Sequence, residues 1–413
     1  MQKTKRLMTY KKSEFNYIQK NRDYYLVYNT LYNSLVRMNA SEFNKYSKLI
    51  NIDYNFSNLL IQNGLWVESE LDEKTKYLAC AEAYTLSVPR PLSITITTTL
   101  KCNARCIYCF ENGVKQTDII EGVEEKLLDF IKKHNKSNEV HLVLFGGEPL
   151  LNIPFIDSLC NSLTEAEIIY STYIITNGSL LNKELIESKF DYWNIKDMQV
   201  TLDGVKNVYE KIKNYKFPHE GMFYSILDNI RIAAENDVFV NIRLNIGKDN
   251  KDSIIELIKE LDKIFGQYNN VVFYPAFLAG NQEIQDEDER IEFIKKMLFS
   301  IKNVQKLTAG MRFYSLPRMH ACMNGDPTSF SIDVNGNIYT CECNVGRSKY
   351  RIGELTEGLF INDLRGQDVT FSEECRHCVF LPKCFGGCEA NRNKNNIPCM
   401  IEKYLLKAYL QIL

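Results

Sequence analysis

The stretch "TTTLKCNARCIYCFENG" (residues 97–113) places three cysteines within eight positions, at Cys102, Cys106 and Cys109. Structural zinc takes four ligands and usually finds them as two pairs. An iron–sulfur cluster is held by cysteine thiolates, and a cubane that receives only three of them keeps one iron open. No fourth cysteine or histidine stands nearby, because His134 and His141 belong to the next expected helix and strand. The loop therefore favours a cluster whose open iron binds a substrate or cofactor.

Composition narrows the class of protein. The chain has 413 residues, 45% of them hydrophobic, enough for more than one core. Its 50 Lys+Arg against 52 Asp+Glu give a net charge of -2, which argues against a nucleic-acid partner. We find no apolar run of 18 residues and no signal peptide, so the sequence predicts a cytoplasmic protein without a membrane partner.

Cysteine usage points to metal. There are 13 cysteines, and the cytoplasm keeps thiols reduced, so clustered cysteines there indicate metal binding rather than disulfides. Eight of them follow residue 320. Cys80 and Cys160 stand alone, and we expect them to be small buried hydrophobic side chains.

The middle of the chain alternates strand-like and helical segments. Six runs rich in Val, Ile, Thr and Tyr are expected to be strands, at residues 93–99, 141–145, 172–176, 198–202, 239–245 and 271–277. Segments with helical spacing separate them. This alternation predicts an α/β fold in which a parallel sheet closes, wholly or partly, into a (β/α)6 barrel.

Polar motifs follow the expected strands one after another. The three-cysteine loop follows the first strand, "GGEP" (146–149) the second, "NGS" (177–179) the third and "DG" (203–204) the fourth, while Arg243 and Asn245 lie near the end of the fifth. Alone, each "NG" or "DG" is typical of an ordinary turn. Active sites of α/β barrels form at the C-terminal ends of the strands, so together the motifs predict one site on that rim.

The two ends of the chain differ from the barrel segment. Residues 1–88 are expected to form a small α+β module, with short strands in "FNYIQ", "DYYLVYNT" and "NSLVRMN" and helices near 41–50 and 55–63. Ser41 is the expected N-cap of the first helix. The segment "LSVPRPLS" (86–93) should be an extended linker to a barrel at 89–318. Residues 319–413 form a cysteine-rich domain that depends on metal for its fold.

The motif Cys102-x3-Cys106-x-Tyr108-Cys109 resembles the signature of the radical S-adenosylmethionine (SAM) enzymes, and "GGEP", "TNG" and "TLDG" follow in that family's order. In this family the open iron of a [4Fe–4S] cluster chelates the amino and carboxylate groups of SAM. One electron then splits SAM into methionine and a 5′-deoxyadenosyl radical, which abstracts hydrogen from the substrate. The resemblance also implies an external one-electron reductant similar to flavodoxin or ferredoxin.

The resemblance implies roles for individual residues. Glu148 would accept a hydrogen bond from the SAM ammonium group. Gly146 and Gly147 would let backbone approach the methionine moiety, and Tyr108 would lie beside the adenine. The remaining implied contacts are to the ribose hydroxyls, from Asn177, Thr201 and Asp203, and to the SAM carboxylate, from Arg243. No general base can be identified, because the acidic candidates are too many.

The C-terminal cysteines resemble the seven-cysteine SPASM domain, which holds two auxiliary [4Fe–4S] clusters. By that resemblance the first cluster takes Cys322, Cys341 and Cys388, and the second takes Cys375, Cys378, Cys384 and Cys399. Cys343 either completes the first cluster or is a bystander. From spacing alone, CxxC followed by CxxxC is also typical of a zinc ribbon.

Proteins of this kind mostly modify peptides. The order of elements at 1–88, ending in "LIQNGLWVESE", resembles winged-helix domains that bind a leader peptide as an added strand. The resemblance implies a maturase of a ribosomally made precursor peptide that forms a thioether or carbon–carbon cross-link. Two alternatives remain: an anaerobic sulfatase-maturating type that oxidises Cys or Ser to formylglycine, and a non-catalytic metal-binding protein.

Overall fold

The computed structural model describes residues 9–50, 52–87, 90–218, 220–310, 316–360, 371–388 and 399–413. The chain divides into two units. One combines residues 1–87, 312–322 and 366–413, and we call it the terminal unit; the other, the barrel unit, combines residues 88–311 and 323–365. The expected linker at 86–93 includes positions 88 and 89, which lie outside the described residues. The three-domain division made from the sequence stays a prediction.

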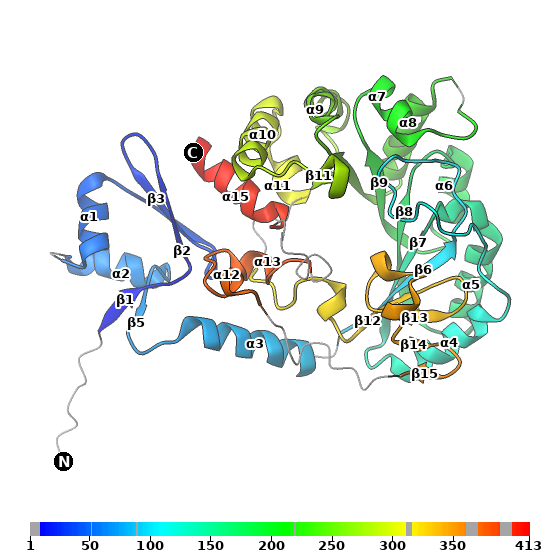
Figure 1. Ribbon diagram of the computed structural model, residues 1–413, viewed down its shortest axis with the longest axis horizontal. Helices are drawn as coiled ribbons and strands as arrows, with labels where there is room; N and C mark the ends of the chain where they lie inside the picture. Colours follow the sequence, from blue (N-terminus) through cyan, green and yellow to red (C-terminus); the bar gives the residue numbers. More distant parts are fainter. Residues whose placement is uncertain are drawn as a thin grey trace, which may run out of the picture. The chain divides into compact units, whose positions relative to one another are not determined.

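Six parallel strands form the sheet of the barrel unit, side by side in chain order (Figure 1). They are β6 (Leu92–Thr99), β7 (Glu139–Gly146), β8 (Ile169–Thr176), β9 (Ile195–Leu202), β10 (Phe239–Ile246) and β11 (Val271–Phe277). Most of their apolar side chains are buried, as expected for a parallel sheet, although Ile169 at the start of β8 is exposed. The predicted α/β fold with six parallel strands is confirmed.

The sheet does not close on itself. The free edge of β6 is taken by β12 (Ser329–Ile332), which pairs with it in parallel. The short strands β13 (Asn337–Tyr339), β14 (Gly353–Glu354) and β15 (Gly358–Leu359) then continue the sheet in antiparallel fashion. The barrel is therefore partial. No strand was predicted in this part of the chain, because the four residues of β12, two of them serines, are too few to show an alternating pattern.

Helices connect the parallel strands. They are α4 (Val123–His134), α5 (Ile153–Glu165), α6 (Lys183–Lys189), α7 (Lys206–Lys213), α8 (Met222–Glu235), α9 (Lys251–Phe265), α10 (Glu287–Ser300) and α11 (Gln305–Gly310). In α4 the buried residues are Val123, Leu127, Phe130 and Ile131, a spacing that forms one apolar face. Acidic residues in its first turn and basic ones in its last complement the helix dipole.

The N-terminal part of the terminal unit has the expected strands and helices. An antiparallel sheet contains β2 (Asn16–Lys20), β3 (Tyr25–Asn29) and β4 (Ser34–Met38), and β1 (Tyr10–Lys12) pairs with β5 (Trp66–Glu68). The helices are α1 (Ala40–Lys48), α2 (Tyr54–Gln62) and α3 (Glu73–Ser87).

The expected N-cap at Ser41 is wrong. Asn39 is the cap of α1, and its side chain accepts hydrogen bonds from the backbone N–H groups of Ser41 and Glu42, both at 2.9 Å. The Glu42 carboxylate accepts from the Asn39 N–H at 2.8 Å, which completes a capping box. Asparagine followed three positions later by glutamate is the stronger signal, and it places the helix start at Ala40.

Both ends of the chain contribute to one core of the terminal unit. Buried side chains from the N-terminal part pack with others from the cysteine-rich part: Phe15, Tyr77, Ala81, Ala321, Phe371, Leu381 and Phe385. The rings of Tyr77 and Phe385 meet edge to face with centroids 6.0 Å apart. The Lys383 amine donates to Asn33 Oδ1 at 3.0 Å. The C-terminal helices here are α12 (Glu373–Arg376), α13 (Leu381–Cys384) and α15 (Ile401–Ile412).

Two further expectations can be compared with the structure. Cys160 is buried as expected, but Cys80 is exposed. The buried side of α3 is formed by residues spaced by four, Glu73, Tyr77, Ala81 and Thr85, and Cys80 lies off that row.

Among the described residues, no helix combines the length and the apolar character needed to cross a bilayer.

Candidate functional site

The three-cysteine loop follows β6 at the C-terminal edge of the sheet. Burial raises the pKa of Cys102 to about 11, and the charges of Glu148, Cys106 and Cys109 add to the shift. The fold therefore brings these three thiols and Glu148 together. The described residues contain no group of three or more His, Cys, Asp or Glu side chains arranged to hold a metal ion. A cubane binds each thiolate through a different iron and so spaces its ligands more widely than a single ion does.

The two glycines of "GGEP" allow β7 to approach this loop closely. Gly146 has φ +130°, and a Cβ there would lie 2.1 Å from the carbonyl oxygen of Thr99. A Cβ on Gly147 would lie 2.2 Å from the carbonyl oxygen of Lys101. The N–H groups of Gly147 and Glu148 instead donate to these two carbonyls, each at 2.9 Å. The glycines thus fix the start of the cysteine loop; their approach to the methionine moiety stays a prediction.

Glu148 is a fully buried carboxylate on the rim. It accepts hydrogen bonds from the Thr176 hydroxyl at 2.8 Å, the Asn177 N–H at 2.8 Å and the Leu150 N–H at 3.2 Å. Burial raises its pKa to about 7. Within the described part of the chain, no Lys, Arg or His forms an ion pair with it. A positively charged amino group beside this carboxylate would offset the free-energy cost of burying it. The predicted hydrogen bond from the SAM ammonium group to Glu148 would supply such a charge.

The other predicted contacts lie at the ends of β8, β9 and β10. The Asn177 amide donates to Asn103 Oδ1 at 2.9 Å, which ties the end of β8 to the cysteine loop. Thr201 and Arg243 are directly opposite each other in the register of β9 and β10. Arg243 donates from Nε to Asn245 Oδ1 at 3.0 Å. Their contacts with ribose and carboxylate stay predictions.

A buried polar triangle lies under the loop. The Tyr108 hydroxyl donates to Asp203 Oδ1 at 2.7 Å, Lys213 Nζ lies 3.1 Å from Asp203 Oδ2, and Lys213 donates to the Tyr108 hydroxyl at 3.2 Å. Asp203 Oδ2 is held by this ion pair alone, because it accepts no hydrogen bond of regular geometry from the described residues. It is therefore a buried acceptor that could take a ribose hydroxyl, as predicted for Asp203.

Sequence reasoning missed Lys213. Lysines near helix C-termini normally reach solvent, where they complement the helix dipole. Lys213 instead shares the buried face of α7 with Tyr209 and Ile212. The only sequence signal was that Ile212 and Lys213 lie three and four positions after Tyr209, which puts the three residues on one side of the helix.

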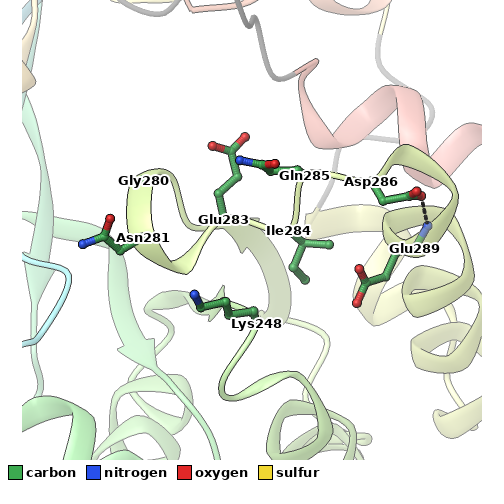
Figure 2. Close-up of a pocket in the computed structure, with 8 residues that line it drawn as sticks. All are labelled: Lys248, Gly280, Asn281, Glu283, Ile284, Gln285, Asp286 and Glu289. Carbon is green, nitrogen blue, oxygen red and sulfur yellow. Dashed lines mark hydrogen bonds between the residues drawn. The ribbon is translucent and has the colours of Figure 1, made fainter.

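A cavity of about 590 Å³ opens after the last two strands (Figure 2). Its lining residues follow β10 and β11, and they are Lys248, Gly280, Asn281, Glu283, Ile284, Gln285, Asp286 and Glu289. Acidic side chains that line the cavity already have partners in the protein. Glu283 pairs with Arg290 at 3.0 Å, and Asp286 caps α10 by accepting from the Glu289 N–H at 2.8 Å. This cavity was not anticipated from the sequence.

Four of the C-terminal cysteines lie together in the terminal unit. Burial raises the pKa of Cys384 to about 12, and Cys378, Cys399 and Cys375 add to the shift. These are the four ligands predicted for the second auxiliary cluster. For the first, Cys322 and Cys388 belong to the terminal unit and Cys341 to the barrel unit. A hydrogen bond with Cys343 raises the pKa of Cys341, so these two thiols are adjacent. Both ligand sets stay predictions.

Comparison with known proteins decides the family. Residues 96–261 match the model of the Radical SAM superfamily. The protein is an enzyme with a radical SAM domain. The family uses a [4Fe–4S] cluster and SAM. The alternative of a non-catalytic metal-binding protein is therefore wrong.

Relatives of this radical SAM enzyme include maturases. The cysteine-type anaerobic sulfatase-maturating enzyme of Clostridium perfringens (strain ATCC 13124) is 24% identical over 358 residues, which cover 75% of this chain and 91% of that protein. The structure of anSMEcpe with bound AdoMet superposes with a TM-score of 0.61 at 17% identity, over 78% of this chain and 95% of that one. Streptococcus suis SuiB bound to precursor peptide SuiA gives a TM-score of 0.53 at 15% identity, over 93% and 96%. These structural likenesses confirm the fold.

Proposed function

We propose that this radical SAM enzyme matures a ribosomally made precursor peptide, in which it forms a thioether or carbon–carbon cross-link. The observation that carries the proposal is the pairing of two features in one chain. The barrel unit has three cysteines beside a buried carboxylate on one rim, and the terminal unit has a three-stranded antiparallel sheet with helices. SuiB, whose fold is similar across 93% of this chain, has been seen with its precursor peptide.

Residues of the rim would hold SAM. When bound together, SAM and the reduced cluster supply a radical that abstracts hydrogen. Cys102, Cys106 and Cys109 would ligate that cluster, and Glu148 would accept from the SAM amino group. The remaining contacts would come from Tyr108 to the adenine, from Asn177, Thr201 and Asp203 to the ribose, and from Arg243 to the carboxylate. Two buried acceptors support this placement: Asp203 Oδ2, which has an ion pair but no regular hydrogen bond, and Glu148, which has no ion-pair partner among the described residues.

The C-terminal cysteines would hold two auxiliary [4Fe–4S] clusters, which would supply an acceptor for the second electron that cross-linking releases. The gathering of Cys375, Cys378, Cys384 and Cys399 supports the second of these sites. An external reductant similar to flavodoxin or ferredoxin would supply the first electron. A leader peptide would add as a strand to the β2–β3–β4 sheet. With these partners, the reaction would take place in the cytoplasm.

A second candidate is oxidation of a cysteine or serine to formylglycine. The similarity to a sulfatase-maturating enzyme over 91% of that protein favours it. An enzyme of that kind would act on a sulfatase sequence rather than on a precursor with a leader. The two candidates therefore differ in how the substrate is bound. A precursor peptide would be bound through its leader, outside the modified segment, whereas a sulfatase would be bound through the modified segment itself.

The test uses anaerobically reconstituted protein. Three cubanes of four irons predict about twelve iron atoms per chain. A candidate precursor encoded beside the gene should lose two hydrogens for each cross-link, as measured by mass spectrometry, whereas a sulfatase-derived peptide should stay unchanged. The matched control replaces Cys102, Cys106 and Cys109 with Ala, which should remove about a third of the iron and all SAM cleavage. Bound zinc without charge-transfer absorption would refute the proposal, and conversion of the sulfatase peptide alone would favour the second candidate.

A further inference from the structure

We infer that Lys213 is a positioning residue that fixes the three-cysteine loop and, through its buried positive charge, makes the cluster held there easier to reduce. The inference rests on the proposed function, because it assumes that the loop binds a cluster. It concerns a side chain to which neither the motifs nor the family's signature assigns a role.

Backbone contacts tie the end of α7 to the loop. The Lys213 carbonyl accepts from the Arg105 N–H at 2.9 Å, and the Ile212 carbonyl accepts from the Ile107 N–H at 3.3 Å. Beyond the helix, the Lys216 N–H donates to the Asn103 carbonyl at 2.8 Å. Three hydrogen bonds thus join residues 212–216 to the segment between Cys102 and Cys109. Movement of Lys213 would therefore be transmitted directly to the ligands.

The side chain of Lys213 is buried against the same loop. Only 3% of it is exposed, and its amine lies between Asp203 Oδ2, at 3.1 Å, and the Tyr108 hydroxyl, at 3.2 Å. Burial lowers the pKa of Lys213, but the charge of Asp203, with help from Tyr108 and Cys106, raises it well above its usual value. The ion pair with Asp203 holds the amine in its charged form, and the hydrogen bond to Tyr108 places it beside the residue that directly precedes Cys109.

A fixed charge this close to a cluster acts on its reduction. Reduction adds one negative charge to the cluster, and net charge and solvent exposure are two of the features that set its potential. A buried cation stabilises the added charge with little screening by salt, and a buried anion opposes it. Lys213 and Asp203 should therefore shift the potential in opposite directions. A purely structural ion pair predicts instead that both losses damage the loop in the same way.

The experiment measures the midpoint potential of the cluster whose electron paramagnetic resonance signal changes when SAM is added. Lys213→Met should lower the midpoint so that the ratio of reduced to oxidised cluster, at the wild-type midpoint, falls about tenfold, a shift of about 59 mV for one electron. Asp203→Asn should raise the midpoint. The double variant should return close to wild type, and Lys213→Arg should stay close to it. Lys216→Met, which removes a nearby but exposed cation, is the matched control and should change nothing.

Equal or same-direction shifts in Lys213→Met and Asp203→Asn would overturn the inference. Should Lys213→Met lose the cluster altogether, iron content replaces the midpoint as the measurement. Retention of iron in both Lys213→Arg and the double variant would then support a role for charge balance. Loss of iron in the double variant would overturn the inference. A wild-type protein with no SAM-responsive cluster would refute the proposed function instead, and it would be seen before any variant is made.

Discussion

Glu148→Gln is the sharpest test of how the rim holds SAM. The change keeps the shape of the side chain but removes its charge and replaces one acceptor oxygen with a donor. If the new NH2 takes the place of Oε2, it faces the Asn177 N–H, and if it takes the place of Oε1, it faces the Leu150 N–H. Either orientation therefore sets one donor against another.

The magnitude follows from these contacts. A hydrogen bond to a charged group contributes about 1.5–3 kcal/mol, so its loss should weaken SAM binding about 10- to 150-fold. The effect should also depend on pH, because burial raises the pKa of Glu148 to about 7, from 4.5. Below that pKa the carboxyl of the wild type holds a proton that must leave before it can accept from SAM. Between about pH 8 and pH 6 the advantage of wild type over the variant should shrink about tenfold.

The assay is equilibrium binding of SAM to anaerobic protein, with iron content measured in parallel. Glu139→Gln makes the same chemical change on an exposed residue at the other end of β7, and its affinity should equal that of wild type. If Glu148→Gln binds SAM as tightly as wild type with its iron intact, the rim does not hold the amino group where we place it. A loss that is independent of pH would show that the carboxylate acts through the fold.

Three further outcomes are expected. Replacing the four gathered cysteines with Ala together (Cys375, Cys378, Cys384 and Cys399) should remove about a third of the iron and lower the melting temperature of the terminal unit, as measured by iron assay and circular dichroism. Gly146→Ala forces a Cβ to within 2.1 Å of a backbone oxygen at positive φ, so it should destabilise the barrel unit by more than about 1 kcal/mol in urea unfolding. Asn39→Ala should cost about 1 kcal/mol through loss of the α1 cap, whereas Ser41→Ala, the matched control, should be nearly neutral.

The sheet could be predicted because each of its six strands carries its own signal. A strand such as β6, which is buried on both faces, consists of a run of β-branched residues. That run predicts a strand without knowledge of the strand that pairs with it. β12 has only four residues, and it becomes a strand because the edge of β6 is free to pair with it. Pairing of that kind is a tertiary property, and local sequence does not encode it.

The same distinction separates the parts of the site. The cysteine loop and Glu148 could be placed because their motifs directly follow strands, and parallel strands bring their C-terminal ends to one rim. Lys213 could not, because nothing local distinguishes a buried lysine at a helix end from a solvated one. Its burial depends on Asp203, which directly follows β9, and on Tyr108, which lies in the loop after β6.

The terminal unit has a consequence for how peptide capture can be tested. Phe15 and Tyr77 share a core with Leu381 and Phe385, which flank the cysteines proposed to hold the second auxiliary cluster. The hydroxyl groups of Thr30 and Tyr77 also donate to the backbone carbonyls of Val379 and Arg318. Deleting residues 1–88 would therefore expose the core under the cluster site, and any loss of activity would have two causes. Leader binding has to be tested by point changes on exposed strand positions such as Ile18 and Leu35, which leave this shared core intact.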